Sequence, residues 1–402
     1  MSKVIGSDLM GVYNRAPVEV ARGEGCWLEA ADGTRFLDCV AGIATNSLGH
    51  CHPGLIAALT AQAGKLWHVS NIFRIPDQEA LAHRLAGASF ADVVFFGNSG
   101  SEAVECALKT ARRYHATHGA PERIDVIGFA GSFHGRTYAA VNASGNPAYL
   151  DGFGPRLPGY IQLEIDDQAA IEGALRAPTA AAVIVEPVQG EGGARALPGA
   201  WLQWLRQLCD ETGTLLIYDE VQCGMGRTGK LFAHQWFEGA APDIMAVAKA
   251  LGGGFPVGAC LASAKAAVGM TVGAHGSTFG GNPLAMAVGC AAFDLLADPA
   301  LLAHVEALGN QLAEGLRALV ARYPDVAVDV RGKGLLIGVK LVTNNREMMA
   351  TARAHHLLVA GGGENCIRLL PPLVMKAEEA TEVLRRLEAA FATTRAQLAQ
   401  AA

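Results

Sequence analysis

The sequence predicts an α/β protein with two domains: a large domain whose mainly parallel sheet is flanked by helices, and a smaller α+β domain. From about residue 90 to residue 265, short apolar runs alternate with helical stretches, which is typical of βαβ units. After about residue 285, long amphipathic helices take over. We expect an N-terminal segment (1–50) that packs with the small domain, a large domain (51–285) and a small domain (286–402).

Six apolar runs are expected to be the strands of the large domain, because they are apolar on both faces, as strands buried in a parallel sheet are. In chain order they are 92–98 (DVVFFGN), 124–130 (IDVIGFA), 181–187 (AAVIVEP), 214–220 (TLLIYDE), 243–249 (DIMAVAK) and 257–263 (VGACLAS). In the small domain, residues 301–324 and 376–400 have helical spacing, and the run 334–342 (GLLIGVKLV) between them is typical of a strand.

The composition is typical of a well-packed enzyme. Hydrophobic residues make up 51% of the chain and charged residues 17%, which argues against disorder. The net charge of −6 and the lack of a basic run argue against nucleic-acid binding. No apolar stretch is long enough for a membrane span, and the first twenty residues lack a signal-peptide core, so we expect a cytoplasmic protein without a membrane partner.

The cysteines and histidines suggest neither disulfides nor a metal. The nine cysteines contain no C-x-x-C pair, as expected of reduced and mostly buried thiols. His50, Cys51 and His52 lie together in GHCHP, but adjacent residues rarely face one ion and no second ligand cluster is evident. We therefore expect a turn that ends at Pro53 and no metal site.

Residues 224–230 (GMGRTGK) fit two nucleotide-binding patterns, each incompletely. Their glycines match the G-x-G-x-x-G fingerprint of dinucleotide-binding proteins, and two of them with the lysine match most of a phosphate loop. The phosphate loop requires Ser or Thr at the next position, where this chain has Leu231. The dinucleotide pattern requires an acid at the end of the next strand, which ends in Lys249. An NAD- or ATP-binding enzyme remains a rival hypothesis.

The functional residues are expected where the strands end, because ligands of an open parallel sheet bind beyond its carboxyl edge. A lysine and a carboxylate at this edge suit pyridoxal phosphate, which needs a lysine for a Schiff base and an acid for its pyridinium nitrogen. Taken alone, Lys249 is equally compatible with a solvated strand end, but the glycine-rich stretch 250–259 after it lets backbone approach a ligand. The polar residues at the strand ends are Asn98, Ser99, Glu186, Asp219 and Lys249.

The residues after Asp219 suit the rest of the cofactor ring. Val221 lies two positions on, so it shares one side of the strand with Asp219 and is expected to pack against the ring face. Gln222 follows where the chain leaves the sheet and is expected to donate to the phenolic oxygen of the cofactor. Asp219, Val221 and Gln222 therefore form one candidate group.

A helix start provides the candidate phosphate site. Ser99 and Glu102 form an S-x-x-E capping box, which predicts that a helix begins there. The N–H groups of Gly100 and Ser101 would then be free at the positive end of the helix dipole, where an anion binds. An ordinary capped helix without a ligand is the alternative.

Ten stretches, in this order along nearly the whole chain, resemble the class III pyridoxal-phosphate aminotransferases, and among these most closely the acetylornithine enzymes. The resemblance implies the type I fold of pyridoxal-phosphate transferases, and it makes GMGRTGK the loop that follows the cofactor aspartate. The stretches are RGEGCWLEAADGTRFLD, GIATNSLGHCHP, FFGNSGSEAVECALK, GSFHGRT, EPVQGEGG, YDEVQCGMGRTG, AKALGGGFPVGA, HGSTFGGNPLA, VRGKGLLIGV and IRLLPPLV.

The resemblance assigns cofactor roles residue by residue. It implies that the protein is a homodimer with shared sites, because Thr278 would reach the phosphate of the neighbouring subunit's cofactor. The other roles are Lys249 for the Schiff base, Asp219 for the pyridinium nitrogen, Gln222 for a cofactor contact, Gly100 and Ser101 for the phosphate, and Phe133 on the ring face opposite Val221.

Substrate roles also follow from the resemblance. Arg136, with Ser277 nearby, would bind the α-carboxylate of an acylated ornithine, and Arg368 that of glutamate or 2-oxoglutarate. Glu191 would pair with Arg368 in one half-reaction and swing aside in the other, because an unpaired buried charge costs several kcal/mol.

The resemblance implies that the terminal amine of N-acetylornithine is transferred to 2-oxoglutarate, giving N-acetylglutamate semialdehyde and glutamate. Succinylornithine, N-succinyl-diaminopimelate, ornithine and 4-aminobutyrate remain alternative amines. A catalytically silent relative that acts as a binding protein is a further alternative, and the presence of both Lys249 and Asp219 argues against it.

Overall fold

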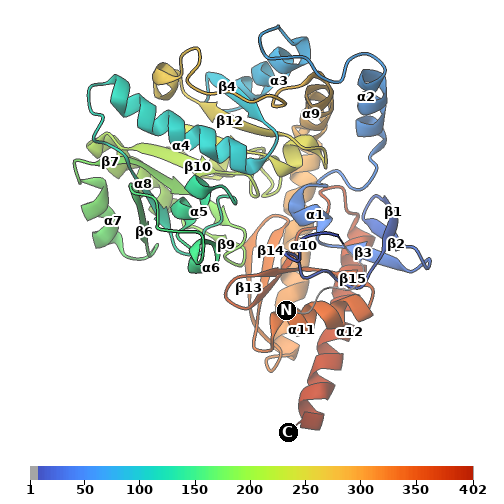
Figure 1. Ribbon diagram of the computed structural model, residues 1–402. Coiled ribbons are helices and arrows are strands. Elements are labelled where there is room, and N and C mark those ends of the chain that lie inside the picture. The colour runs from blue at the N-terminus through green and yellow to red at the C-terminus, as the bar shows by residue number, and fades with distance from the viewer. Residues whose placement is uncertain (1–7, 402) are drawn as a thin grey trace.

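A computed structural model describes residues 8–401 of the chain (Figure 1). Its largest sheet has seven strands in the order β4-β12-β11-β10-β7-β5-β6. Only β12 runs antiparallel to its neighbours, β4 and β11, while the other neighbouring pairs are parallel. The strands are β4 (Val93–Gly97), β5 (Asp125–Phe129), β6 (Tyr160–Leu163), β7 (Ala180–Val185), β10 (Leu215–Asp219), β11 (Ile244–Val247) and β12 (Gly258–Ala262).

All six strands predicted for this sheet are present. The seventh, β6, was not predicted, because its sequence YIQL is short, contains a polar residue and is only partly buried at the sheet edge. The predicted mainly parallel α/β sheet is confirmed.

The two faces of the sheet are buried in separate hydrophobic cores. On β10, Ile217 packs into the core that includes helix α4 (Gly100–Thr117), whereas Leu216 and Tyr218 point into the core that includes α8 (Gly199–Thr212). This alternation follows from the two-residue period of a strand. Both faces of the sheet are therefore covered, and a ligand can reach the sheet only where its strands end.

Further helices surround this sheet (Figure 1). Helices α2 and α3 each pack against α9, and the short strands β8 and β9 form an antiparallel pair after β7. The bounds are α1 (Ala41–Ala44), α2 (Pro53–Ala63), α3 (Pro76–Gly87), α5 (Tyr138–Ser144), α6 (Pro147–Leu150), α7 (Gln168–Leu175), α9 (Pro283–Leu296), β8 (Val188–Gln189), β9 (Arg195–Ala196) and the 3₁₀ turns η1 (Ala233–Trp236), η2 (Lys249–Gly252) and η3 (Ala266–Gly269).

The C-terminal part contains a four-stranded antiparallel sheet in the order β13-β14-β17-β16, with long helices beside it. The predicted helices and the strand between them are present within two residues of their expected limits. The elements are α10 (Pro299–Arg322), β13 (Ala327–Lys333), β14 (Leu336–Leu341), α11 (Asn345–Ala354), β16 (Ala360–Gly362), β17 (Cys366–Leu369) and α12 (Ala377–Ala401).

The N-terminal strands lie beside the C-terminal part (Figure 1). They are β1 (Val20–Glu24), β2 (Trp27–Ala30) and β3 (Arg35–Asp38), and β3 pairs in parallel with β15 (Leu357–Leu358). We propose domain boundaries near residues 50 and 285. The pairing of β3 with β15 supports assigning the N-terminal segment to the small domain.

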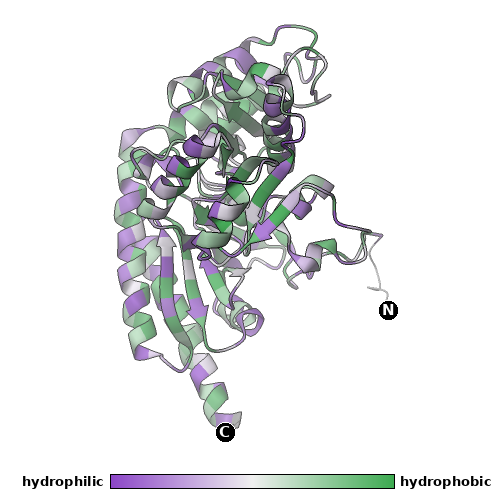
Figure 2. Cartoon of the chain, turned by 90° about the vertical axis from the view of Figure 1, so that its left-hand side faces the viewer, coloured by the Kyte–Doolittle hydropathy of each residue, from purple (hydrophilic) through white to green (hydrophobic). Residues whose placement is uncertain are grey.

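Figure 2 shows that the outer helices carry both hydrophilic and hydrophobic residues along their length, as amphipathic helices do. Among residues 8–401, no single helix has the length and hydropathy to cross a membrane, and only the pair α9 and α10, bent by 65°, passes the same test together.

The stretch GMGRTGK connects the two larger parts of the molecule. Arg227 is fully buried and donates to the carbonyl oxygens of Leu335 and Pro371 and to Ser47 Oγ. In return, Leu335 N donates to the carbonyl of Arg227 at 3.0 Å. Burial lowers the pKa of Arg227 to about 9. The loop thus binds other segments of its own chain, including Leu335 directly before the strand β14.

Candidate active site at the carboxyl edge of the sheet

A cavity of about 350 Å³ lies at the carboxyl ends of β7, β10 and β11 and at the start of α4. This is the edge at which the sequence predicted the site. Eight predicted site residues line it: Gly100, Ser101, Phe133, Glu191, Asp219, Val221, Gln222 and Lys249. Thr45 also lines the cavity, although nothing in the sequence had indicated it.

Lys249 begins the turn η2, and only Ala248 separates it from the end of β11. Its φ of +44° lies in the left-handed region, which costs a non-glycine residue of order 1–3 kcal/mol and is frequent at functional sites. Its side chain faces the cavity, and burial lowers the pKa of its amine to about 8, with the charge of Arg368 acting in the same direction and that of Glu191 opposing it. About a tenth of this amine is therefore neutral at pH 7, far more than for a lysine with its ordinary pKa.

Asp219 is buried at the end of β10 and has a partner on each oxygen. His134 Nδ1 lies 2.8 Å from Asp219 Oδ2, and Val221 N donates to Oδ1 at 3.0 Å. Burial by itself would lower the pKa of His134, but the hydrogen bond to Asp219 and the charges of Asp219 and Glu186 outweigh it and raise this pKa. The histidine thus helps to hold the carboxylate of Asp219 in a fixed orientation.

Sequence reasoning gave His134 no role, although it stands next to Phe133 in SFHGRT. Its partner is 85 residues away along the chain, so no local pattern could indicate the pair. Its second ring nitrogen, Nε2, is buried without a hydrogen-bond partner among the described residues.

Glu186 follows β7 and connects two loops at the cavity. Its carboxylate accepts the backbone N–H of Phe133 and that of Gly190, each at 3.1 Å. Burial raises its pKa to about 7, and the nearby charge of Asp219 acts in the same direction. From the sequence, Glu186 was a polar residue at a strand end without an assigned role. In the structure, its hydrogen bonds hold the loops that contain Phe133 and Gly190.

The helix α4 begins as predicted, but only one of the two hydrogen bonds expected for a capping box is formed. Ser99 Oγ accepts from Glu102 N at 3.3 Å, as expected of an N-cap. The carboxylate of Glu102 accepts from the backbone N–H and the side chain of Asn98 rather than from Ser99. It can approach there because Gly97 has no side chain: a Cβ on Gly97 would lie 2.7 Å from Glu102 Oε2.

The start of α4 remains open to the cavity. Its first N–H groups, those of Gly100 and Ser101, have no partner within the helix. A Cβ on Gly100 would lie 2.7 Å from Val221 Cγ1, so a larger residue would displace the wall formed by Val221. The helix start therefore offers donors and positive dipole charge to an anion in the cavity.

Glu191 lines the cavity and forms an ion pair with Arg368, which is not itself a lining residue. Arg368 Nη1 lies 2.7 Å from Glu191 Oε1, and Nη2 donates to Oε2 at 2.8 Å. The Arg368 side chain is 2% exposed and that of Glu191 is 31% exposed, so the carboxylate is the partner with room to move. Arg368 also donates to Gln222 Oε1 at 3.0 Å and to the carbonyl of Gly361 at 2.9 Å.

Besides Arg368, three predicted residues do not line the cavity: Arg136, Ser277 and Thr278. The exposed guanidinium of Arg136 lies over the ring of Tyr149, 3.7 Å from its centroid, and 5.3 Å from that of Phe133. Ser277 Oγ accepts from Asn98 Nδ2 at 3.4 Å. Thr278 is exposed and does not line the cavity of its own chain. The expected proximity of Ser277 to Arg136 stays a prediction.

The histidines of GHCHP have protein partners. His50 Nε2 lies 2.8 Å from Asp38 Oδ2. His52 Nδ1 accepts from Gly54 N at 3.1 Å and so caps α2, which begins at Pro53. Within residues 8–401, no group of three or more His, Cys, Asp or Glu side chains is arranged to hold a metal ion.

The residues of the cavity fit pyridoxal phosphate. The helix start suits a phosphate, Lys249 offers an amine with a lowered pKa, and Asp219 offers a buried carboxylate. Val221 and Phe133 supply apolar surface for a ring.

Comparison with known proteins decides the family. The profile of the family described as "Aminotransferase class-III" matches residues 11–391. The chain belongs to this family. A relative, "Acetylornithine aminotransferase 2" of Caulobacter vibrioides, is 66% identical over 391 residues, covering 97% of this chain and 96% of the relative.

Solved structures of aminotransferases have the same fold. The N-acetylornithine aminotransferase of Stenotrophomonas maltophilia superposes with a TM-score of 0.84 at 38% identity, covering 96% of this chain and 98% of its own. The ornithine aminotransferase of Toxoplasma gondii gives a TM-score of 0.92 at 33% identity, covering 97% and 94%. The protein is a pyridoxal-phosphate-dependent aminotransferase, and its cofactor is not the NAD or ATP of the rival hypothesis.

Proposed function

We propose that the protein transfers the terminal amine of N-acetylornithine to 2-oxoglutarate, giving N-acetylglutamate semialdehyde and glutamate. The observation that carries this proposal is the pair of Arg368 and Glu191, in which an almost fully buried cation meets a partly exposed carboxylate. Such a pair suits a cavity that receives a dicarboxylate in one half-reaction and an amine without a second carboxylate in the other. The names of the Caulobacter and Stenotrophomonas relatives support the acylated amine.

The cavity residues have separate tasks in this reaction. Pyridoxal phosphate, when bound, withdraws electrons from the carbon that carries the amino group. Lys249 would attach the cofactor and, once its Nζ is free, carry a proton from that carbon, a step worth roughly 10²–10⁴-fold. Asp219, oriented by His134, would hold the charge of the pyridinium nitrogen.

Four further residues would fix the cofactor. The N–H groups of Gly100 and Ser101 would bind its phosphate, as helix starts bind anions. Val221 and Phe133 would contact opposite faces of its ring. Gln222 already accepts a hydrogen bond from Arg368 through its carbonyl oxygen, which leaves its amide group to contact the cofactor.

The ion pair would act as a switch between substrates. With the acylated amine bound, Glu191 neutralises Arg368, which would otherwise be a buried unpaired charge costing several kcal/mol. With 2-oxoglutarate or glutamate bound, the substrate α-carboxylate takes the place of Glu191 on Arg368. Arg136, at the rim beside Phe133, would bind the α-carboxylate of the acylated ornithine.

We further propose a homodimer with shared sites. Thr278 and Ser277 lie on an exposed loop that is bonded to the segment before α3, since Asn71 Nδ2 donates to the carbonyls of Ser277 and Gly280. Large apolar side chains are exposed on both segments, which is typical of an interaction surface. These side chains are Leu66, Trp67, Ile72, Phe73, Val272 and Phe279. From such a surface Thr278 would reach the neighbouring subunit's phosphate.

A cytoplasmic location is also proposed. All nine cysteines are free thiols, and seven of them are buried. Free thiols are typical of proteins that stay in a reducing compartment.

A substrate panel tests the proposed amine donor. We expect kcat/KM to be highest for N-acetylornithine, at least about tenfold above ornithine, because the α-ammonium of ornithine would have to lose water beside the cation of Arg136. 4-Aminobutyrate should be poorer still, since its carboxylate is one carbon closer to the amine. N-succinylornithine or N-succinyl-diaminopimelate as the best substrate would instead assign the enzyme to that amine.

The same panel measured on Arg136→Ala tests the carboxylate site. We expect kcat/KM for N-acetylornithine to fall roughly 10- to 150-fold, as hydrogen bonds to a charged group contribute about 1.5–3 kcal/mol. The glutamate half-reaction should change much less. Equal losses in both would contradict separate roles for Arg136 and Arg368.

The lowered pKa of Lys249 predicts a pH profile. In the enzyme form whose lysine is free, the rate with 2-oxoglutarate should rise with pH and level off above about 8, because only the neutral amine accepts a proton. At pH 7 it should be about tenfold below the plateau. 2-Oxoglutarate has no amine that titrates in this range, so stopped-flow measurements from pH 6 to 10 report on the enzyme.

A flat profile between pH 7 and 9 would contradict this assignment of the base. Glu191→Gln serves as the control. The charge of Glu191 raises the pKa of Lys249, so its removal should move the inflection to lower pH.

A further inference from the structure

The short loop that carries Glu191 is flexible by composition but held by its surroundings. Gly190, Gly192 and Gly193 surround Glu191, and glycines give a free chain many conformations. In the structure, Gly190 N donates to Glu186 Oε1 at 3.1 Å. The N–H of Gly363 donates to the carbonyl of Glu191 at 2.7 Å. The backbone on both sides of Glu191 is therefore held in place.

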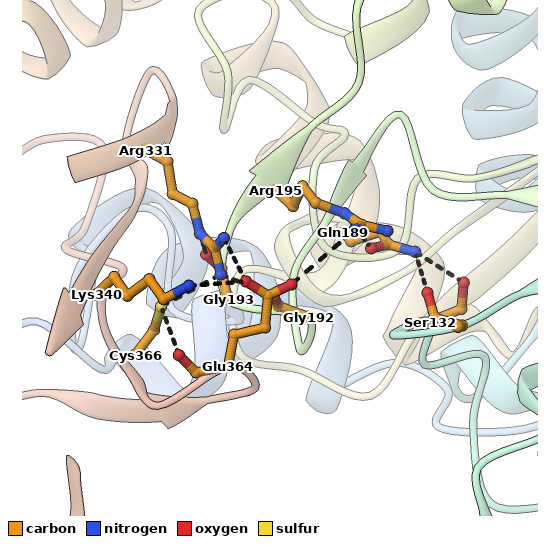
Figure 3. Close-up of polar contacts among 10 residues, drawn as sticks. Ser132, Gln189, Gly192, Gly193, Arg195, Arg331, Lys340, Glu364 and Cys366 are labelled. Atoms are coloured by element: carbon orange, nitrogen blue, oxygen red, sulfur yellow. Dashed lines mark hydrogen bonds and ion pairs between the residues drawn. The ribbon is translucent and has the colours of Figure 1, made fainter. Parts of the chain in front are cut away.

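Arg331 holds the remaining part of this loop (Figure 3). From β13, its Nε donates to the carbonyl of Gly193 at 2.7 Å and its Nη2 to that of Gly192 at 3.2 Å. Glu364 fixes the guanidinium from the other side, accepting from Nη1 at 2.7 Å. The fit is close, since a Cβ on Gly193 would lie 2.4 Å from Arg331 Nη2.

Arg331 does not line the cavity, so it can influence substrates only through the groups that it contacts, which are this loop, Glu364 and Cys366 Sγ on β17. Its planar guanidinium aims several donors in fixed directions, and two of them reach neighbouring carbonyls. A lysine at this position would offer one flexible ammonium and could not reproduce both directions.

We propose that Arg331 is the positioning residue of the Glu191 switch. By fixing the backbone at Gly192 and Gly193, it confines switching to the Glu191 side chain and favours the state in which Glu191 pairs with Arg368. The inference deepens the proposed function and depends on it.

The two half-reactions should then respond differently to the loss of Arg331. The amine half-reaction needs Glu191 on Arg368, and a loosened loop weakens that pairing. The dicarboxylate half-reaction needs Glu191 to leave, and a loosened loop does not oppose this.

The test uses the holoenzyme of the parent, Arg331→Gln, Arg331→Lys, Glu191→Gln and Lys340→Gln. Single-turnover absorbance changes give the rate of each half-reaction, with the best amine of the panel and with 2-oxoglutarate. Calorimetry gives the Kd of glutarate, a dicarboxylate that cannot react. Lys340 is the matched control, because its Nζ lies 3.9 Å from the same carboxylate of Glu364 while its side chain does not bond the loop.

We expect Arg331→Gln to slow the amine half-reaction about tenfold to hundredfold. The 2-oxoglutarate half-reaction should stay within about threefold of the parent, and glutarate should bind equally well or more tightly. Arg331→Lys should show the same asymmetry with a smaller amplitude, which keeps the test available if Arg331→Gln does not fold. Lys340→Gln should resemble the parent.

Equal losses in both half-reactions, or weaker glutarate binding by the same factor, would overturn the role of Arg331. A matching asymmetry in Lys340→Gln would also overturn it, because removal of a nearby charge would then explain the effect. Glu191→Gln separates the two levels of inference. If Glu191→Gln also affects both half-reactions equally, the proposed switch itself fails. If Glu191→Gln shows the asymmetry and Arg331→Gln does not, only the role of Arg331 is refuted.

Discussion

Replacing Lys249 with alanine should abolish transamination and leave the fold intact. The variant loses the amine that we propose holds the cofactor, and it also loses a proton carrier whose contribution alone is roughly 10²–10⁴-fold. The fold should persist because the side chain faces the cavity and its burial already lowers the pKa of the amine, so its removal relieves an unfavourable interaction. Alanine at a φ of +44° is no more strained than lysine.

Single-turnover absorbance with glutamate measures the activity of Lys249→Ala, and circular dichroism with thermal unfolding measures its fold. Lys265→Ala is the control. Lys265 is exposed and follows the last residue of β12, whereas the cavity lies at the start of that strand. Turnover near the parent rate in the folded variant would refute the proposed role of Lys249.

Asp219→Asn should reduce kcat/KM about 10²- to 10³-fold and weaken retention of the cofactor. The substitution keeps the shape but removes the buried charge that faces His134, and breaking a buried charged pair costs about 3–5 kcal/mol. The pKa of His134 should fall as well, because its hydrogen bond to Asp219 and the charge of Asp219 are what raise it.

Steady-state rates and the cofactor content after dialysis measure this effect, and an NMR titration of His134 reports its pKa. Asp166→Asn, at an exposed position away from the cavity, is the control. Parental kcat/KM together with normal cofactor content would contradict the proposed partnership with the pyridinium nitrogen.

The strands and the edge that carries the site were predictable because they depend on local patterns. Buried parallel strands are apolar on both faces, so the runs before Asp219 and Lys249 stand out, and the fold class then fixes the edge at which they end. The helix start at Ser99 was visible for the same reason, since its N-cap bond spans three residues.

Contacts between distant segments were not predictable from spacing. His134 meets Asp219 across 85 residues, and Arg331 meets Gly193 across 138. The partner of Glu102 was missed for a different reason: the absent side chain of Gly97 allows an approach that a capping pattern does not include. Such contacts depend on how the elements pack.

Arg227 has a consequence for anyone who recombines this enzyme with its relatives. Its cation is fully buried, and its hydrogen-bond acceptors in the described chain are neutral oxygens from three separate segments, at Ser47, Leu335 and Pro371. In a chimera whose C-terminal third alone comes from a relative, the acceptors at Leu335 and Pro371 come from one parent, while Arg227 and Ser47 come from the other. Crossover points are therefore best chosen so that all four positions come from one parent.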